Sequence, residues 1–80
     1  METEITICLE NVENAKEFVS LAEKFKGDVD VLSGRYIVNG KSILGVLSLV
    51  LSEQMTASIH SDDQEEIDQF AEVMKPFIKK

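Results

Sequence analysis

Eighty residues, 44% of them hydrophobic, suffice for one small domain with a single core, predicted to span residues 1–80. Eight lysines and arginines stand against fifteen aspartates and glutamates, which gives a formal net charge of −7. This balance argues against nucleic acid and anionic membranes as partners, because proteins bind both through clustered cations. The single cysteine, Cys8, excludes an internal disulfide.

No targeting or membrane-spanning segment is predicted. The first four residues, Met-Glu-Thr-Glu, are acidic, whereas a signal peptide starts with basic residues. The longest apolar run, at 43–51, is interrupted by Gly45 and Ser48 and is too short to cross a bilayer. We therefore expect a cytoplasmic protein.

The N-terminal third of the chain predicts a strand and a helix. Apolar residues alternate through 5–9, as they do in a strand that buries one face. Asn11 and Asn14 favour a helix start, and Gly27 suits the end of that helix. Between them, apolar residues recur at the spacing of an amphipathic helix, namely Ala15, Phe18, Val19, Ala22 and Phe25.

A β-hairpin and a short helix are predicted next. Valines alternate with aspartates at 28–31, and a tight turn at 33–34 leads into a returning strand at 35–39. Ser42 is a favoured first residue for a helix. That helix is expected to place five apolar residues on or near its buried side, namely Ile43, Leu44, Val46, Leu47 and Val50.

The rest of the chain predicts a fourth strand at 56–60 and a third helix. Ser61 and Gln64 have the spacing of a capping box, and Pro76 is expected in or near the last helical turn. The buried stripe of this helix is predicted to comprise Ile67, Phe70, Ala71, Met74 and Phe77 or Ile78. The order β-α-β-β-α-β-α predicts an α+β open-faced sandwich, in which three helices cover one face of a four-stranded, mostly antiparallel sheet.

The segment VNGKSILGVLSL, residues 38–49, leads into and fills the short second helix. Together with the element order and the length, it resembles HPr, the histidine-containing phosphocarrier family of the bacterial phosphoenolpyruvate:sugar phosphotransferase system. The resemblance covers nearly the whole chain and is strongest over 24–49. In Gram-positive members, the serine matching Ser42 is the target of an ATP-dependent HPr kinase. The resemblance also implies a docking surface for partners at Lys41, Ile43, Leu44 and Leu47.

The other half of the family signature is absent. HPr proteins carry Gly-(Ile/Leu)-His-Ala-Arg-Pro-Ala where this chain has residues 9–15, and only Ala15 matches. Asn11 stands at the phosphohistidine position and Glu13, with its charge reversed, at the arginine position. An amide nitrogen cannot replace imidazole as the nucleophile, because its lone pair is delocalised into the carbonyl. The resemblance thus implies a member that lacks a catalytic residue and does not carry phosphate on histidine.

Ser42 has two interpretations, and the sequence leaves both open. Its hydroxyl can accept a hydrogen bond from the free backbone N–H groups of a helix start, whether or not it is modified. A phosphate there would face the positive end of the helix, with Lys41 beside it.

The remaining reactive side chains are expected to be structural. His60 has no histidine or cysteine nearby at metal-binding spacing, and Cys8 fits a packed strand residue. The acidic segment 62–66 is expected in the first turn of a helix, where negative charge is favourable. We expect no metal, no cofactor and no enzymatic activity, because no base–nucleophile pair is apparent.

The leading hypothesis is a regulatory docking protein controlled through Ser42. It resembles the catabolite-repression HPr homologues, which lack the histidine, keep the serine and bind a LacI-type regulator when phosphorylated. The expected partners are an HPr kinase or a transcriptional regulator. Two alternatives are a small-ligand-binding module of the ferredoxin-like or ACT type, which shares the β-α-β-β-α-β order, and a phosphocarrier with an unrecognised acceptor.

Overall fold

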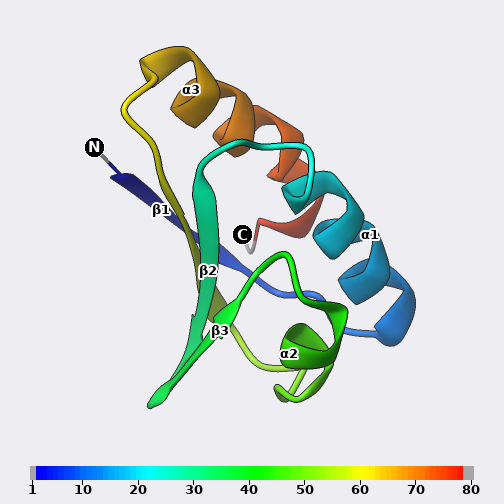
Figure 1. The fold of residues 1–80 in the computed structure, drawn as a ribbon. Coiled ribbons are helices and arrows are strands. Elements are labelled where there is room, and N and C mark those ends of the chain that lie inside the picture. The colour runs from blue at the N-terminus through cyan, green and yellow to red at the C-terminus, as the bar shows by residue number, and fades with distance from the viewer. Residues whose placement is uncertain (1, 79–80) are drawn as a thin grey trace.

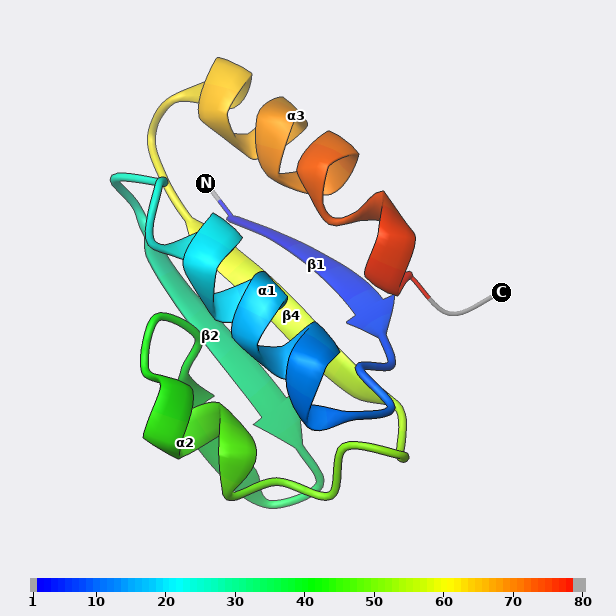
Figure 2. The same ribbon diagram turned by 90° about the vertical axis from the view of Figure 1, so that its right-hand side faces the viewer.

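The computed structural model describes residues 2–78, so Met1, Lys79 and Lys80 of the predicted domain lie outside the described residues. Its strands are β1 (Glu2–Ile7), β2 (Asp28–Ser33), β3 (Tyr36–Asn39) and β4 (Met55–His60). Its helices are α1 (Val12–Ala22), α2 (Ile43–Leu47), α3 (Gln64–Val73) and the 3-10 helix η1 (Lys75–Phe77). The three α-helices lie on one face of the sheet, so the predicted open-faced sandwich is confirmed (Figure 1, Figure 2).

The strands form an antiparallel sheet in the spatial order β1-β4-β2-β3. In the middle of the sheet, Ala57 of β4 lies opposite Ile5 of β1 and Val31 of β2. Because side chains alternate along a strand, these three face the helices, whereas Thr56 and Asp30 face away from them. The largest fully buried side chains are Phe18, Phe70, Ile7, Leu9, Ile59, Met74, Val29, Val31 and Val46.

Helix α1 packs on the sheet with the face that the sequence predicted. Its buried residues recur three or four positions apart and are Ala15, Phe18, Val19 and Ala22. The rings of Phe18 and Phe77 meet edge to face, with 5.8 Å between their centroids. The first helix and the C-terminal segment therefore share one core.

The predicted role of Gly27 as the helix stop is wrong. Helix α1 ends at Ala22, and Phe25 is buried outside the helix, where its ring packs edge to face on Phe70 at 5.5 Å. A Cβ atom at position 27 would collide with the backbone carbonyl oxygen of His60. Glycine is therefore needed here for a close approach of two backbones rather than for ending a helix.

The predicted start and end of the third helix also need correction. Asp63, not Ser61, is the N-cap of α3, and its Oδ1 accepts a hydrogen bond of 3.0 Å from the backbone N–H of Glu65. The Ser61 hydroxyl instead accepts from the backbone N–H of Asp63. The helix ends at Val73, and Pro76 lies in η1, because proline lacks the N–H that would continue an α-helix.

Helix α2 is shorter than predicted, and its apolar side chains are only partly buried. Val46 is buried, and Ile43 and Leu47 are half-buried. Leu44 is 80% exposed, and Val50 lies beyond the helix end and is 57% exposed, so the predicted place of these two residues on the buried side is wrong. None of the helices within residues 2–78 is long and apolar enough to cross a membrane.

Candidate functional site

The start of α1 carries an asparagine that acts as a helix cap. Asn11 has an extended backbone, and its side-chain oxygen accepts a hydrogen bond of 2.8 Å from the backbone N–H of Asn14. The side-chain amide nitrogen of Asn14 in turn donates a hydrogen bond of 2.9 Å to the backbone carbonyl oxygen of Leu9. Asn11 thus satisfies a backbone donor and offers no nucleophilic nitrogen.

Glu10, just before this cap, has a left-handed backbone with φ of +72°. Glycine, asparagine and aspartate adopt this region readily, whereas other residues do so at some cost. Its backbone N–H donates a hydrogen bond of 2.7 Å to the carbonyl of Leu51, which joins the start of α1 to the segment after α2. Sequence reasoning missed this turn, because glutamate carries no signal for it.

The start of α2 carries the predicted serine. The Ser42 hydroxyl oxygen caps the helix by accepting a hydrogen bond of 3.2 Å from the backbone N–H of Gly45. The Ser42 side chain is half-buried, so part of it faces solvent. A Cβ atom at Gly45 would lie 3.4 Å from this oxygen, in ordinary van der Waals contact.

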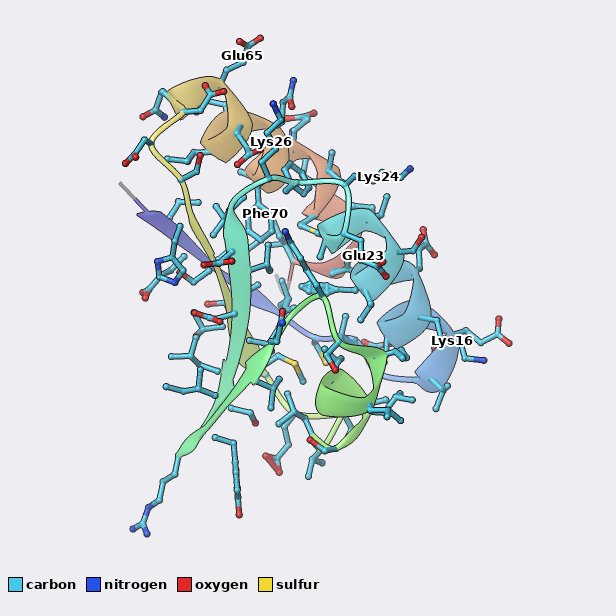
Figure 3. The ribbon with its side chains drawn as sticks, viewed as in Figure 1. Lys16, Glu23, Lys24, Lys26, Glu65 and Phe70 are labelled. Atoms are coloured by element: carbon cyan, nitrogen blue, oxygen red, sulfur yellow. The ribbon has the colours of Figure 1, made fainter. Side chains whose placement is uncertain are left out.

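Lys41 connects the start of α2 with the turn after α1. Its ammonium group donates a hydrogen bond of 2.6 Å to the carbonyl oxygen of Phe25. Lys24 and Lys26 flank Phe25 and are exposed (Figure 3). The ammonium group of Lys41 therefore lies at the turn that carries Lys24 and Lys26, where it makes a structural contact.

Glu66 of α3 holds the same turn from the other side. Its two carboxylate oxygens accept hydrogen bonds of 2.9 Å from the backbone N–H groups of Lys26 and Gly27. The hydrogen bond from Lys26 is the main cause that lowers the pKa of Glu66 below its usual value, and it outweighs the opposing effect of desolvation. The bond from Gly27, the Ser61 hydroxyl and the charge of Lys41 act in the same direction.

Helix α2 packs beside α1 on the helix-covered side of the molecule (Figure 2). An α-helix of eleven residues such as α1 is about 16 Å long. Lys41, beside Ser42, reaches Phe25 beyond the far end of α1, whereas Glu10, beside Asn11, bonds to Leu51. Four apolar residues run along α2 and on to the start of α1, and we call them the apolar ridge: Leu44, Leu47, Val50 and Val12.

His60 lies away from this ridge, on the sheet face that the helices leave open, whereas Cys8 lies beside the segment that follows Val50. His60 Nε2 is 3.0 Å from a carboxylate oxygen of Asp30. The Cys8 thiol contacts the carbonyl oxygens of Leu51 and Ser52, at 3.8 and 3.6 Å. Within residues 2–78, no group of three or more histidine, cysteine, aspartate or glutamate side chains is arranged to hold a metal ion.

Comparisons with known proteins agree with this arrangement. The family whose sequence model is described as "PTS HPr component phosphorylation site" matches residues 2–79. Because the match covers almost the whole chain, it defines the class of protein as a component of the phosphotransferase system. The chain belongs to the HPr phosphocarrier family.

Three solved structures show how far the chain has diverged from its relatives. A phosphocarrier protein HPr from Bacillus anthracis superposes with a TM-score of 0.75 at 23% identity, over 99% of this chain and 96% of that one. HPr-C-His from Thermoanaerobacter tengcongensis gives 0.66 at 28% identity, over 91% of both chains. The Bacillus subtilis catabolite repression protein Crh, described as a domain-swapped dimer, gives 0.62 at 27%, over 92% and 88%. No curated protein sequence matches this chain.

Proposed function

We propose that this HPr-family protein does not carry phosphate on histidine and acts as a regulatory docking protein switched by phosphorylation of Ser42. Its partners are an HPr kinase and, after phosphorylation, a transcriptional regulator. The proposal places the protein in the cytoplasm, where ATP is available to such a kinase. It assigns no enzymatic activity and no cofactor to the chain itself.

The observation that carries the proposal is the contrast between Asn11 and Ser42. Both cap a helix through a side-chain oxygen, but only the serine hydroxyl can become a phosphate ester. In that step, the Ser42 oxygen bonds to the γ-phosphorus of ATP, ADP leaves, and the hydroxyl proton passes to a base of the kinase.

The surroundings of Ser42 favour a phosphate group. The backbone N–H of Gly45 already points at the hydroxyl oxygen, and the cationic residue Lys41 directly precedes Ser42 in the chain. A phosphoserine adds a charge of roughly −1.5 to −2, which these groups would balance. The docking residues Ile43, Leu44 and Leu47 follow directly and leave apolar surface beside the modified side chain.

Intact-mass measurement after two parallel incubations tests this proposal. With an HPr kinase and ATP, we expect one added phosphoryl group on the wild type and none on Ser42→Ala. With Enzyme I and phosphoenolpyruvate, we expect no added phosphate. Acid-labile phosphate from Enzyme I would instead support a phosphocarrier with another acceptor, and no phosphate from either would rule out the serine switch.

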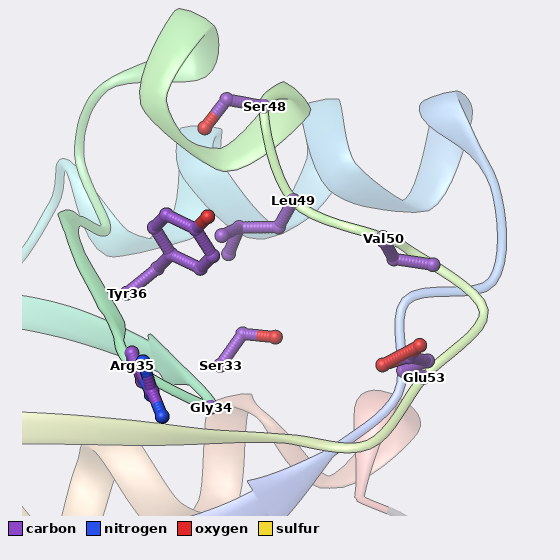
Figure 4. Close-up of a pocket in the computed structure, with 8 residues that line it drawn as sticks. All are labelled: Ser33, Gly34, Arg35, Tyr36, Ser48, Leu49, Val50 and Glu53. Carbon is purple, nitrogen blue, oxygen red and sulfur yellow. The ribbon is translucent and has the colours of Figure 1, made fainter.

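A second candidate function, small-ligand binding, is favoured by an open groove of about 450 Å3 between the β2–β3 hairpin and the segment after α2 (Figure 4). This volume is within the range of ligand pockets, roughly 300–1,000 Å3. Tyr36, Leu49 and Val50 supply apolar walls. A rise in melting temperature with an amino acid, lost in Tyr36→Ala, would support this candidate over docking.

A further inference from the structure

We propose that the partner docked at the Asn11 end of the apolar ridge presents a basic surface. The inference rests on the proposed docking role but not on phosphorylation of Ser42. It concerns the sign of the partner's charge, which the geometry of the ridge and the acidic residues beside it determine.

The ridge is exposed enough to be an interface. Leu44 is 80% exposed, Val50 57% and Val12 47%. The hydrogen bond from the Glu10 backbone N–H to the Leu51 carbonyl places the segments that carry Val12 and Val50 side by side. Contiguous exposed apolar side chains with a polar border are typical of protein interaction sites.

Carboxylates border this end of the ridge, and we call Glu10, Glu13 and Glu53 the acidic rim. Glu10 and Glu13 flank Val12 in the sequence, and all three rim residues are exposed. The contacts of the Cys8 thiol with Ser52 and of the Glu10 N–H with Leu51 bring the segment of Glu53 to the start of α1. None of the ion pairs that involve residues 2–78 uses a rim carboxylate.

The turn after α1 carries charges of both signs. Lys24 and Lys26 lie at this turn, beside the carbonyl that Lys41 binds, and the Glu66 carboxylate is hydrogen-bonded to its backbone (Figure 3). At the start of α1, by contrast, the three carboxylates of the acidic rim outnumber the one lysine nearby, Lys16, which follows Val12 by one helical turn. The net negative charge there disfavours an acidic partner, because like charges across an interface are strongly unfavourable.

A partner with an apolar strip and lysines or arginines at one end fits this surface. Apolar side chains would cover the ridge, and the cations would pair with the acidic rim. The rim is solvent-exposed, so its contribution should depend on ionic strength. An acidic partner, or a second copy of this chain, whose charge is −7, fits poorly at this end.

Two synthetic amphipathic helical peptides test the inference. The two peptides have equal length and leucines at the same positions. On the polar face of the helix, every residue is lysine in the basic peptide and glutamate in the acidic peptide. In NMR titrations of the 15N-labelled protein, we expect the basic peptide to shift the amides of residues 10–13 and 44–53. We expect the acidic peptide to leave them unchanged and added salt to weaken the basic complex.

Matched charge reversals separate the rim from the overall charge. Glu13 and Glu65 are both exposed acids in the first turn of a helix, but Glu65 lies at the start of α3, away from the ridge (Figure 3). Glu13→Lys should weaken binding of the basic peptide about tenfold, because it places like charges together, and Glu65→Lys should change it less than about twofold.

Three results would overturn the inference. Equal weakening by both variants would mean that the peptide responds only to net charge. Equal binding of the acidic peptide would mean that the apolar ridge alone determines binding, whatever the charge of the peptide. Shifts of the ridge amides on dilution of the protein alone would identify a second copy as the occupant. The kinase incubation described above uses neither peptide, so its failure and a failure here are distinguishable.

Discussion

The starts of α1 and α2 are built alike but carry different chemistry. In each, a side-chain oxygen accepts a hydrogen bond from the backbone N–H three residues later, over 2.8 Å at Asn11 and 3.2 Å at Ser42. Glu13 stands two residues after Asn11, and Lys41 directly precedes Ser42. At the first position the capping side chain is an amide, and at the second it is a hydroxyl.

This difference shows that capping and phosphoryl transfer place separate demands on a side chain. Serine and asparagine are almost equally good caps, because both offer an oxygen on a short side chain. Phosphoryl acceptance also needs a nucleophile and a favourable local charge. A helix start can therefore keep its structure while it gains or loses a phosphorylation site.

The largest expected effect comes from rebuilding the phosphocarrier position. Asn11→His combined with Glu13→Arg restores an imidazole nucleophile and a cation that attracts the phosphoryl group. We expect Enzyme I and phosphoenolpyruvate to add one acid-labile phosphoryl group to this variant and none to the wild type, as measured by intact mass. Asn11→Ala with Glu13→Arg is the control and should stay unmodified. An unmodified histidine variant would show that further features of the position have been lost.

Two substitutions at Ser42 separate its cap from its hydroxyl. Ser42→Ala removes both and should lower the free energy of unfolding by about 1 kcal/mol. Ser42→Asn keeps a capping oxygen, so we expect a change of only a few tenths of a kcal/mol. Urea unfolding measures this contrast. Both variants should resist the kinase, and phosphate on Ser42→Asn would mean that another hydroxyl, such as that of Ser48, is the acceptor.

Glu66 stabilises the turn after α1, and this contribution should depend on pH. The backbone hydrogen bonds lower the pKa of Glu66 from 4.5, so the folded state binds its proton less tightly than the unfolded chain does. The stability it contributes is therefore present above about pH 4.5 and is lost as pH falls through the lowered pKa.

Urea midpoints of the wild type and Glu66→Gln between pH 7 and pH 2 test this expectation. The variant should be less stable at pH 7, because glutamine offers one acceptor to two N–H donors. The difference should shrink as the pH falls below the usual carboxyl range. Glu65→Gln, in the same helical turn, serves as the control for loss of first-turn charge. A difference that persisted unchanged at low pH would contradict the assigned hydrogen bonds.

Most of the fold followed from periodicity, but the contacts around the two helix starts did not. The alternation around Ile7 and the helical spacing of Ala15 and Phe18 reflect burial on one face, which the pattern of apolar residues records directly. The bond of Lys41 to Phe25 and the bonds of Glu66 to a distant turn are long-range polar contacts. No local sequence pattern predicts such contacts, because the residues around Lys41 and Glu66 are equally compatible with a charged side chain that is exposed to solvent.

The exposed residues of α2 show a second limit of the sequence. Leu44 and Val50 fit the apolar pattern as well as Val46 does, yet only Val46 is buried. Helix α2 ends at Leu47, and the Ser48 hydroxyl donates to the Gly45 carbonyl at its last turn, so Val50 falls outside the helical face. The spacing of hydrophobic residues indicates which of them share one face of a helix. It does not show whether that face is buried in the core or exposed on the surface.

A gain in stability, similar in size to the loss in Ser42→Ala, is expected at Glu10, where glycine should relax the backbone. A left-handed φ of +72° costs a non-glycine residue of order 1–3 kcal/mol, and glycine gives back roughly 0.5–1 kcal/mol as extra freedom of the unfolded chain. Glu10→Gly should therefore raise the free energy of unfolding by about 1 kcal/mol while it removes one rim carboxylate. Urea unfolding measures the gain, and Glu10→Ala, which removes the carboxylate but keeps the Cβ, should show none. If both variants were equally stabilised, charge repulsion within the acidic rim, rather than backbone strain, would be the cost that glutamate imposes at this helix start.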